Sequence, residues 1–106
     1  DRDGVTVLGL IGMAELTSAD VIDQKVTLVL ARKPARVVVD LSQLTGISSI
    51  CMGSLVRLKR GLDPRPNSPR VCLSGAQELV TLALRRARLD EFFPMYPTLE
   101  QAIHAA

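Results

Sequence analysis

Two adjacent hydroxyl side chains, Ser48 and Ser49, stand where a hydrophobic segment gives way to one with helical periodicity. A serine at the first turn of a helix can accept a hydrogen bond from a free backbone N–H group, which stabilises the helix by about 1 kcal/mol. A serine at the same place can also carry a phosphate, because a helix N-terminus tolerates an anion. Each serine therefore has two interpretations, helix capping and phosphorylation.

The segments on either side of the two serines predict the elements that position them. Residues 37–41 read V-V-V-D-L, a β-branched run typical of a strand covered on both faces. The polar residues 42–46 predict a turn. After the turn the helical period is carried by Met52, Leu55 and Val56. The sequence thus predicts a central strand, a turn, and a helix that begins near Ser49.

The rest of the chain alternates between strand and helix patterns. The apolar run 5–11 predicts a strand, and Thr17 or Ser18 can cap a helix that ends before Pro34. Three prolines within residues 61–69 predict a loop. A buried strand is predicted over 71–73. The capping-box pattern 74–77 then opens a helix that ends near Arg88 and has Leu79, Leu82 and Ala83 on its apolar side. A short edge strand over 93–96 and a terminal helix opened by Thr98 complete the chain.

This alternation predicts an α/β fold with a mostly parallel or mixed sheet of 4–5 strands and about four helices. The chain has 106 residues, of which 47% are hydrophobic and 23% charged. This composition suffices to bury one core, so we expect a single domain over residues 1–106.

The strand, the D-L-S that follows it, the hydroxyl-containing helix start, the pattern x-G-x-L and the later run LDEFFPMYPTLEQAI together resemble the STAS domain, the fold of bacterial anti-sigma factor antagonists. The resemblance covers nearly the whole chain. In that family the motif usually reads D-S-S/T-G-L-G-x-L, and an anti-sigma factor kinase phosphorylates its first hydroxyl residue. The resemblance implies that Ser49 is this residue, while Ser48, Ile50 and Cys51 replace the Asp, the second hydroxyl and the glycine.

Two further expectations come from the start of the chain. Asp3-Gly4 is a hairpin-type dipeptide, and members of the family usually carry a strand before that turn. We therefore expect a strand upstream of Asp1 that is missing from this sequence.

A helix that begins at Ser49 gives the chain a candidate protein-binding surface. One face of this helix carries residues at positions i, i+3, i+4 and i+7, namely Ile50, Gly53, Ser54 and Arg57. We expect Ile50 to be an apolar anchor and Arg57 a rim charge, although Ile50 could instead pack under a neighbouring loop. Met13 and Glu15 should join this surface, because function in open α/β sheets lies beyond the carboxyl ends of the strands.

Other kinds of site lack support in the sequence. The one histidine, His104, is expected to be a solvated side chain of the terminal helix, and no phosphate-binding glycine motif is present. Cys51 and Cys72 lack metal-ligand spacing and are expected to be buried thiols. We therefore expect no catalytic residue, cofactor or metal. A net charge of +2 with 3% aromatic residues argues against nucleic-acid binding, and no segment is long and apolar enough for membrane insertion.

The resemblance implies an anti-sigma factor antagonist-like module that binds an anti-sigma factor or serine kinase in the cytoplasm and is switched by phosphorylation of Ser49 or Ser48. The alternative is a STAS scaffold without phosphorylation, within a stress-signalling assembly or a transport system. A small-ligand sensor that uses the loops beyond the strand ends is a third hypothesis. The sequence predicts no oligomeric state.

Overall fold

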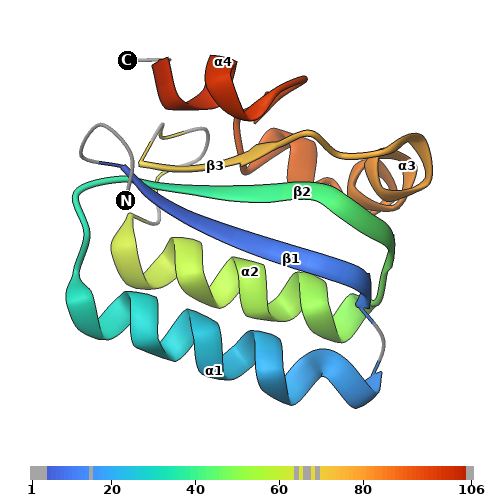
Figure 1. Cartoon of the computed structure of the whole chain (residues 1–106), viewed down its shortest axis with the longest axis horizontal. Coiled ribbons are helices and arrows are strands. Elements are labelled where there is room, and N and C mark those ends of the chain that lie inside the picture. Colours follow the sequence, from blue (N-terminus) through green and yellow to red (C-terminus); the bar gives the residue numbers. More distant parts are fainter. Residues whose placement is uncertain (1–4, 15, 64, 66–67, 69, 105–106) are drawn as a thin grey trace.

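Strands and helices alternate along the chain (Figure 1). The computed structural model describes residues 5–14, 16–63, 65, 68 and 70–104, and for 10–14 and 16–21 it describes the backbone alone. The elements are β1 (Thr6–Ala14), α1 (Leu16–Arg32), β2 (Val37–Ile47), α2 (Ser49–Leu62), β3 (Val71–Ser74), α3 (Glu78–Arg86), the 3₁₀ turn η1 (Leu89–Glu91), β4 (Met95–Tyr96) and α4 (Leu99–His104). The predicted α/β fold is confirmed, whereas the Asp3-Gly4 turn lies outside the described residues.

Within the described residues the sheet has four parallel strands in the order β1-β2-β3-β4, so each strand lies beside its successor. Crossovers between parallel strands are almost always right-handed, and crossovers that all step in one direction place their helices on one face. Accordingly, α1 and α2 lie side by side along one face of the sheet (Figure 1). The helix α4, which follows the last strand and belongs to no crossover, lies over the other face. The carboxyl ends of all four strands meet at one edge, where α1, α2 and α3 begin.

The core consists of two apolar clusters, one on each face of the sheet. The larger cluster joins β1, β2 and β3 to α1, α2 and α3 and includes Val37, Val39 and Phe93. The smaller cluster includes Val38, packed with Ile103 and other residues of α4. All three valines of β2 are fully buried, so the prediction of a strand covered on both faces is confirmed.

The strand β2 is longer than the sequence predicted. Residues 42–46, expected to form a turn, continue β2 and pair with β1. The pairing shifts register twice, between Gly9 and Ile11 and between Gly12 and Met13, and at each shift β2 contains an extra residue. Such bulges bend a strand without ending it. The turn prediction is wrong because β1 supplies backbone partners that a local pattern does not reveal.

The start of α3 also differs from its prediction. The helix begins at Glu78, and its N-cap residue Gln77 makes no side-chain cap hydrogen bond. Ser74 does not open a capping box, because it pairs with Asp40 of β2 and ends β3. The chain turns at Gly75, whose φ of 69° favours glycine. The helix also ends at Arg86, two residues before the predicted end.

The caps predicted for the first and last helices have different outcomes. The helix α1 already begins at Leu16, so Thr17 and Ser18 lie inside its first turn and do not precede the helix. At α4, Gln101 N donates a hydrogen bond to Thr98 Oγ1 at 3.1 Å. The capping prediction for Thr98 is therefore confirmed.

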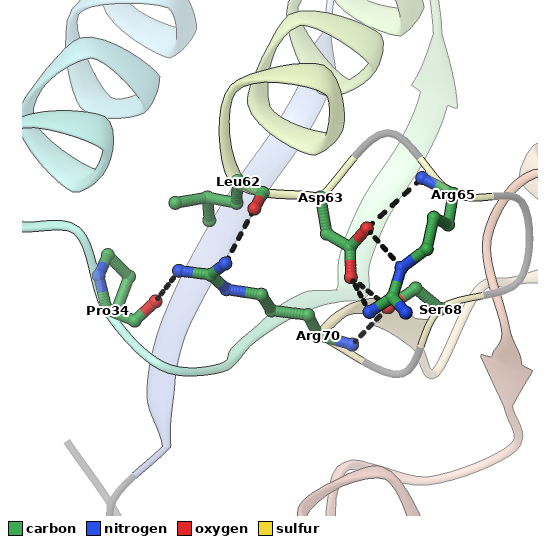
Figure 2. Close-up of polar contacts among 6 residues, drawn as sticks. All are labelled: Pro34, Leu62, Asp63, Arg65, Ser68 and Arg70. Atoms are coloured by element: carbon green, nitrogen blue, oxygen red, sulfur yellow. Dashed lines mark hydrogen bonds and ion pairs between the residues drawn. The ribbon is translucent and has the colours of Figure 1, made fainter.

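Asp63, the residue that follows α2, binds the next segment of the chain through its carboxylate (Figure 2). Asp63 is buried, and its carboxylate accepts hydrogen bonds from Arg65 N, Nε and Nη2 at 3.1, 2.9 and 2.7 Å and from Ser68 Oγ at 2.6 Å. The hydrogen bonds from Arg65, and then the one from Ser68, hold the pKa of the Asp63 carboxyl well below its usual range.

Arg70 ties the C-terminal end of α2 to the segment after α1. Its Nη1 donates to Leu62 O at 2.7 Å and its Nη2 to Pro34 O at 3.1 Å (Figure 2). The predicted loop begins only after Leu62, because Gly61 is still helical. A Cβ atom at Gly61 would lie 2.5 Å from Leu30 Cδ2, so glycine lets α2 pack closely on α1 at this point.

Candidate functional site

Ser48 connects β2 to α2 and caps the helix. Its backbone is extended, with φ −89° and ψ 161°. Its Oγ accepts a hydrogen bond from Cys51 N at 3.2 Å, and its carbonyl oxygen accepts one from Met52 N at 3.0 Å. The capping interpretation is therefore confirmed for Ser48, whose hydroxyl is already engaged.

Ser49 differs from its neighbour. It is the first residue of α2 and is exposed, and no described residue hydrogen-bonds to its hydroxyl. Ile50 is 49% exposed, so it is not enclosed beneath a loop. Gly53, one turn later, is also exposed, with open space where a Cβ would be. The start of α2 thus presents a hydroxyl, an apolar side chain and a flat glycine surface.

The other two residues of the predicted helix face point toward α1. Ser54 is buried, and its Oγ donates to Asp23 Oδ1 at 3.3 Å. Arg57 donates from Nε to Asp23 Oδ1 at 3.1 Å, and from Nη2 to Asp23 O at 3.0 Å and to Thr27 Oγ1 at 2.8 Å. These contacts brace α2 against α1. The structure therefore divides the expected surface, leaving Ile50 and Gly53 exposed and engaging Ser54 and Arg57 within the fold.

The two residues expected from the first strand and the segment after it are placed only in part. Met13 pairs with Gly46 of β2, which is two residues before Ser48, so the backbone of Met13 lies near the carboxyl edge of the sheet. Glu15 lies outside the described residues. The surface can therefore be built from α2, but not from these side chains.

The helix α3 adds exposed apolar side chains, and the sequence pattern had placed both of them on the apolar side of this helix. Leu79 and Leu82 are 70% and 41% exposed, whereas Val80 and Leu84 are fully buried. Both pairs fit the helical period, so periodicity alone could not separate them. Near the start of α3, Gln77 Nε2 donates to Ser42 O at 3.0 Å and links this helix to the extended end of β2.

Catalytic arrangements do not form among the described residues. Asp40 of β2 accepts a hydrogen bond from Ser42 N at 3.0 Å through its Oδ1 atom. His104 is exposed and lies 3.6 Å from Glu100 in an (i, i+4) pair on α4. The structure thus brings no histidine or carboxylate into contact with the Ser49 hydroxyl in the part of the chain it describes.

The two cysteines are free thiols buried in the core, as expected. Burial raises the pKa of Cys51 to about 11. It also raises the pKa of Cys72, although the nearby Arg36 acts in the opposite direction. Over the described ranges, no three His, Cys, Asp or Glu residues are grouped so that they could hold a metal ion, and no helix is long and apolar enough to cross a membrane.

Comparisons with known proteins agree with this architecture. A protein-family model described as the STAS domain matches residues 1–102, while no curated protein sequence matches the chain. An anti-sigma factor antagonist from Mycobacterium paratuberculosis is 26% identical, with 97% of this chain and 86% of that one covered and a TM-score of 0.85.

More distant structures share the fold. A putative anti-sigma factor antagonist from Thermotoga maritima is 21% identical, covering 95% of this chain and 86% of that one with a TM-score of 0.81. A sulfate transporter family protein from Wolinella succinogenes is 16% identical, covering 95% and 83% respectively with a TM-score of 0.74. The same fold thus occurs in regulatory proteins and in transporters.

Proposed function

The chain belongs to the STAS domain family, and from this premise we propose that it is a non-enzymatic, cytoplasmic module that captures an anti-sigma factor kinase through the start of α2. The observation that carries the proposal is the exposure of Ser49 and Ile50 beside a capped and otherwise well-packed helix start. The similar Mycobacterium structure, named an anti-sigma factor antagonist, supports this choice of partner.

The proposed binding surface combines α2 with α3. Ile50 is the apolar anchor, and the glycine at position 53 lets a partner backbone approach closely. Leu79 and Leu82 are exposed apolar side chains of α3, and we include them in the proposed surface because α3 follows β3 at the same edge of the sheet at which α2 follows β2. Exposed apolar side chains are typical of protein-binding sites when a partner covers them.

Ser49 is the proposed phosphorylation site. Its hydroxyl is exposed, whereas the Ser48 hydroxyl holds the helix cap. A phosphate would add about −1.5 to −2 charges at pH 7, and the first turn of α2 contains no acidic side chain to repel it. The domain should therefore remain folded. The modification would weaken the complex instead, because a dianion would have to be desolvated within an apolar interface.

The test uses a purified anti-sigma factor kinase from the same organism. Calorimetric titration measures binding to the wild type, Ile50→Ala and Leu28→Ala, the last being a control because Leu28 is 64% exposed on α1. We expect Ile50→Ala to weaken binding at least about fivefold and Leu28→Ala to leave it unchanged. Equal affinity of the wild type and Ile50→Ala would refute the surface.

Phosphorylation is measured separately, by intact-mass spectrometry and peptide mapping after incubation with the kinase and ATP. We expect one phosphate on the wild type and on Ser48→Ala, and none on Ser49→Ala. A phosphate mapped to Ser48 would contradict the assignment.

A second candidate function is a STAS scaffold that binds its partner without phosphorylation, in a signalling assembly or a transport system. The favouring observation is that Cys51 is fully buried and Ile50 half exposed at positions where the phosphorylated motif usually has a glycine and a hydroxyl. A tight complex that transfers no phosphate would support the scaffold over the switch.

A further inference from the structure

A pocket of about 370 Å³ lies between the second half of α2 and the turn η1. Its lining consists of Val56, Arg60, Arg88, Leu89, Glu91 and Phe92. Val56 is about two helical turns beyond Ser49, so the pocket is separate from the start of α2. Its volume falls within the range of small-molecule sites, roughly 300–1,000 Å³.

The pocket has an apolar wall. Val56, Leu89 and Phe92 pack against the main core, so their positions are fixed by the fold. The ring of Phe92 lies edge-to-face against Phe93 with centroids 5.5 Å apart. These contacts leave a rigid apolar surface for a short alkyl chain or ring.

The polar side of the pocket has more positive than negative charge. Arg60, Arg88 and Glu91 are exposed, and none of their side chains forms a hydrogen bond or ion pair with a described residue. Lys59 is fully buried, with its Nζ 5.1 Å from the centroid of the Phe92 ring and no hydrogen-bond partner within the described chain. The pocket lining therefore offers two guanidinium groups, which pair with no described residue, against one carboxylate, and the Lys59 side chain lies buried behind its Phe92 wall.

Arg88 has an unusual backbone conformation. Its φ is 61° and its ψ 24°, in the left-handed region just after the end of α3. Glycine is the usual residue at such helix ends, because a side chain is strained there. An arginine at this position accepts strain and places a guanidinium group at the pocket.

We propose that this pocket binds a small monocarboxylate with a short apolar tail. The tail contacts Val56, Leu89 and Phe92, and the carboxylate pairs with Arg88 and Arg60, whose planar guanidinium groups match a carboxylate with two parallel hydrogen bonds. This site lies outside the proposed kinase-binding surface and does not depend on it.

The test titrates the isolated chain with octanoate and, as a neutral control of the same length, with 1-octanol. Amide chemical shifts recorded by NMR report both the affinity and the place of binding. We expect octanoate to shift residues 56–60 and 88–92 and to bind at least about fivefold more tightly than octanol. Equal affinity for the two probes, or shifts centred elsewhere, would overturn the proposal.

Substitutions test whether the charged side chains of the pocket determine the affinity for octanoate while the fold is kept. Arg88→Gly removes the guanidinium group and introduces the residue that the backbone favours, so we expect it to remain folded and to bind octanoate about tenfold more weakly. Arg60→Gln should also weaken binding, and Glu91→Gln should tighten it by about twofold. Arg86→Gln is the matched control, because Arg86 is exposed on α3 and does not line the pocket. Wild-type affinity in both Arg88→Gly and Arg60→Gln would refute the site.

Discussion

The two ends of α2 differ in how they are held. At the start, one hydrogen bond from Cys51 N to Ser48 Oγ caps the helix, while Ser49 and Ile50 remain exposed. At the end, Asp63 accepts hydrogen bonds from Arg65 and Ser68, as Figure 2 shows. We call the C-terminal end, where Asp63 and Arg70 make these contacts, the closed end of α2, and the start at Ser49 and Ile50 its open end.

The buried side of α2 holds both ends in place. Cys51, Leu55 and Leu58 are fully buried along the helix, so packing holds α2 from its first turn to its last. Arg57 also binds Asp23 on α1, with Nη2 2.9 Å from Oδ1. The start of α2 is therefore held in place without contacts from the exposed side chains of Ser49 and Ile50.

The largest expected effect is at the closed end. Arg70→Met removes the hydrogen bonds to Leu62 O and Pro34 O, and hydrogen bonds from a charged group are worth about 1.5–3 kcal/mol each. Since two such hydrogen bonds are lost, we expect the free energy of unfolding in urea to fall by at least about 3 kcal/mol. Arg86→Met, an exposed control on α3, should change it by less than about 0.5 kcal/mol. A similar small change in both variants would contradict the role given to the closed end.

The closed end should also be sensitive to acid. The folded pKa of Asp63 is lowered by its hydrogen bonds from Arg65 and Ser68, so its contribution to stability is present above the unfolded pKa of about 3.9. That contribution is lost as the pH falls from this value toward the folded pKa. We therefore expect the stability of the wild type to fall more steeply below about pH 4 than that of Asp63→Asn, measured by urea unfolding across pH. Parallel curves would show that this carboxylate is not the titrating group.

A smaller effect is expected at the helix cap. Ser48→Ala removes the acceptor for Cys51 N and should cost about 1 kcal/mol. Ser48→Asp keeps an acceptor and adds a negative charge at the helix N-terminus, so we expect nearly wild-type stability or a small gain. Urea unfolding checks both variants, and equal losses would argue that the cap is not what Ser48 contributes.

The smallest change in stability is expected one residue later. Ser49→Ala alters an exposed hydroxyl that no described residue contacts, so the free energy of unfolding should change by less than about 0.5 kcal/mol. A loss as large as that of Ser48→Ala would mean that the two serines share one structural role, and the contrast between a closed cap and an open hydroxyl would fail.

Local patterns predicted much of the fold correctly. The alternation of strands and helices, the buried valines of β2, the start of α2 at Ser49 and the cap at Thr98 all depend on residues close together in the chain. Strand burial, helical period and capping are properties of short segments, so they can be read from the sequence.

Partners distant in the sequence decided the rest. Ser54 and Arg57 fit an exposed helix face by spacing, but Asp23, more than 30 residues away in the chain, engages both. The strand β2 continues through a polar segment because β1 pairs with it, and Leu79 is exposed in place of Val80 because of how α3 packs on the sheet. The sequence by itself determined the elements and the position of the two serines. Tertiary packing determined which side chains remain exposed, because burial depends on contacts between elements.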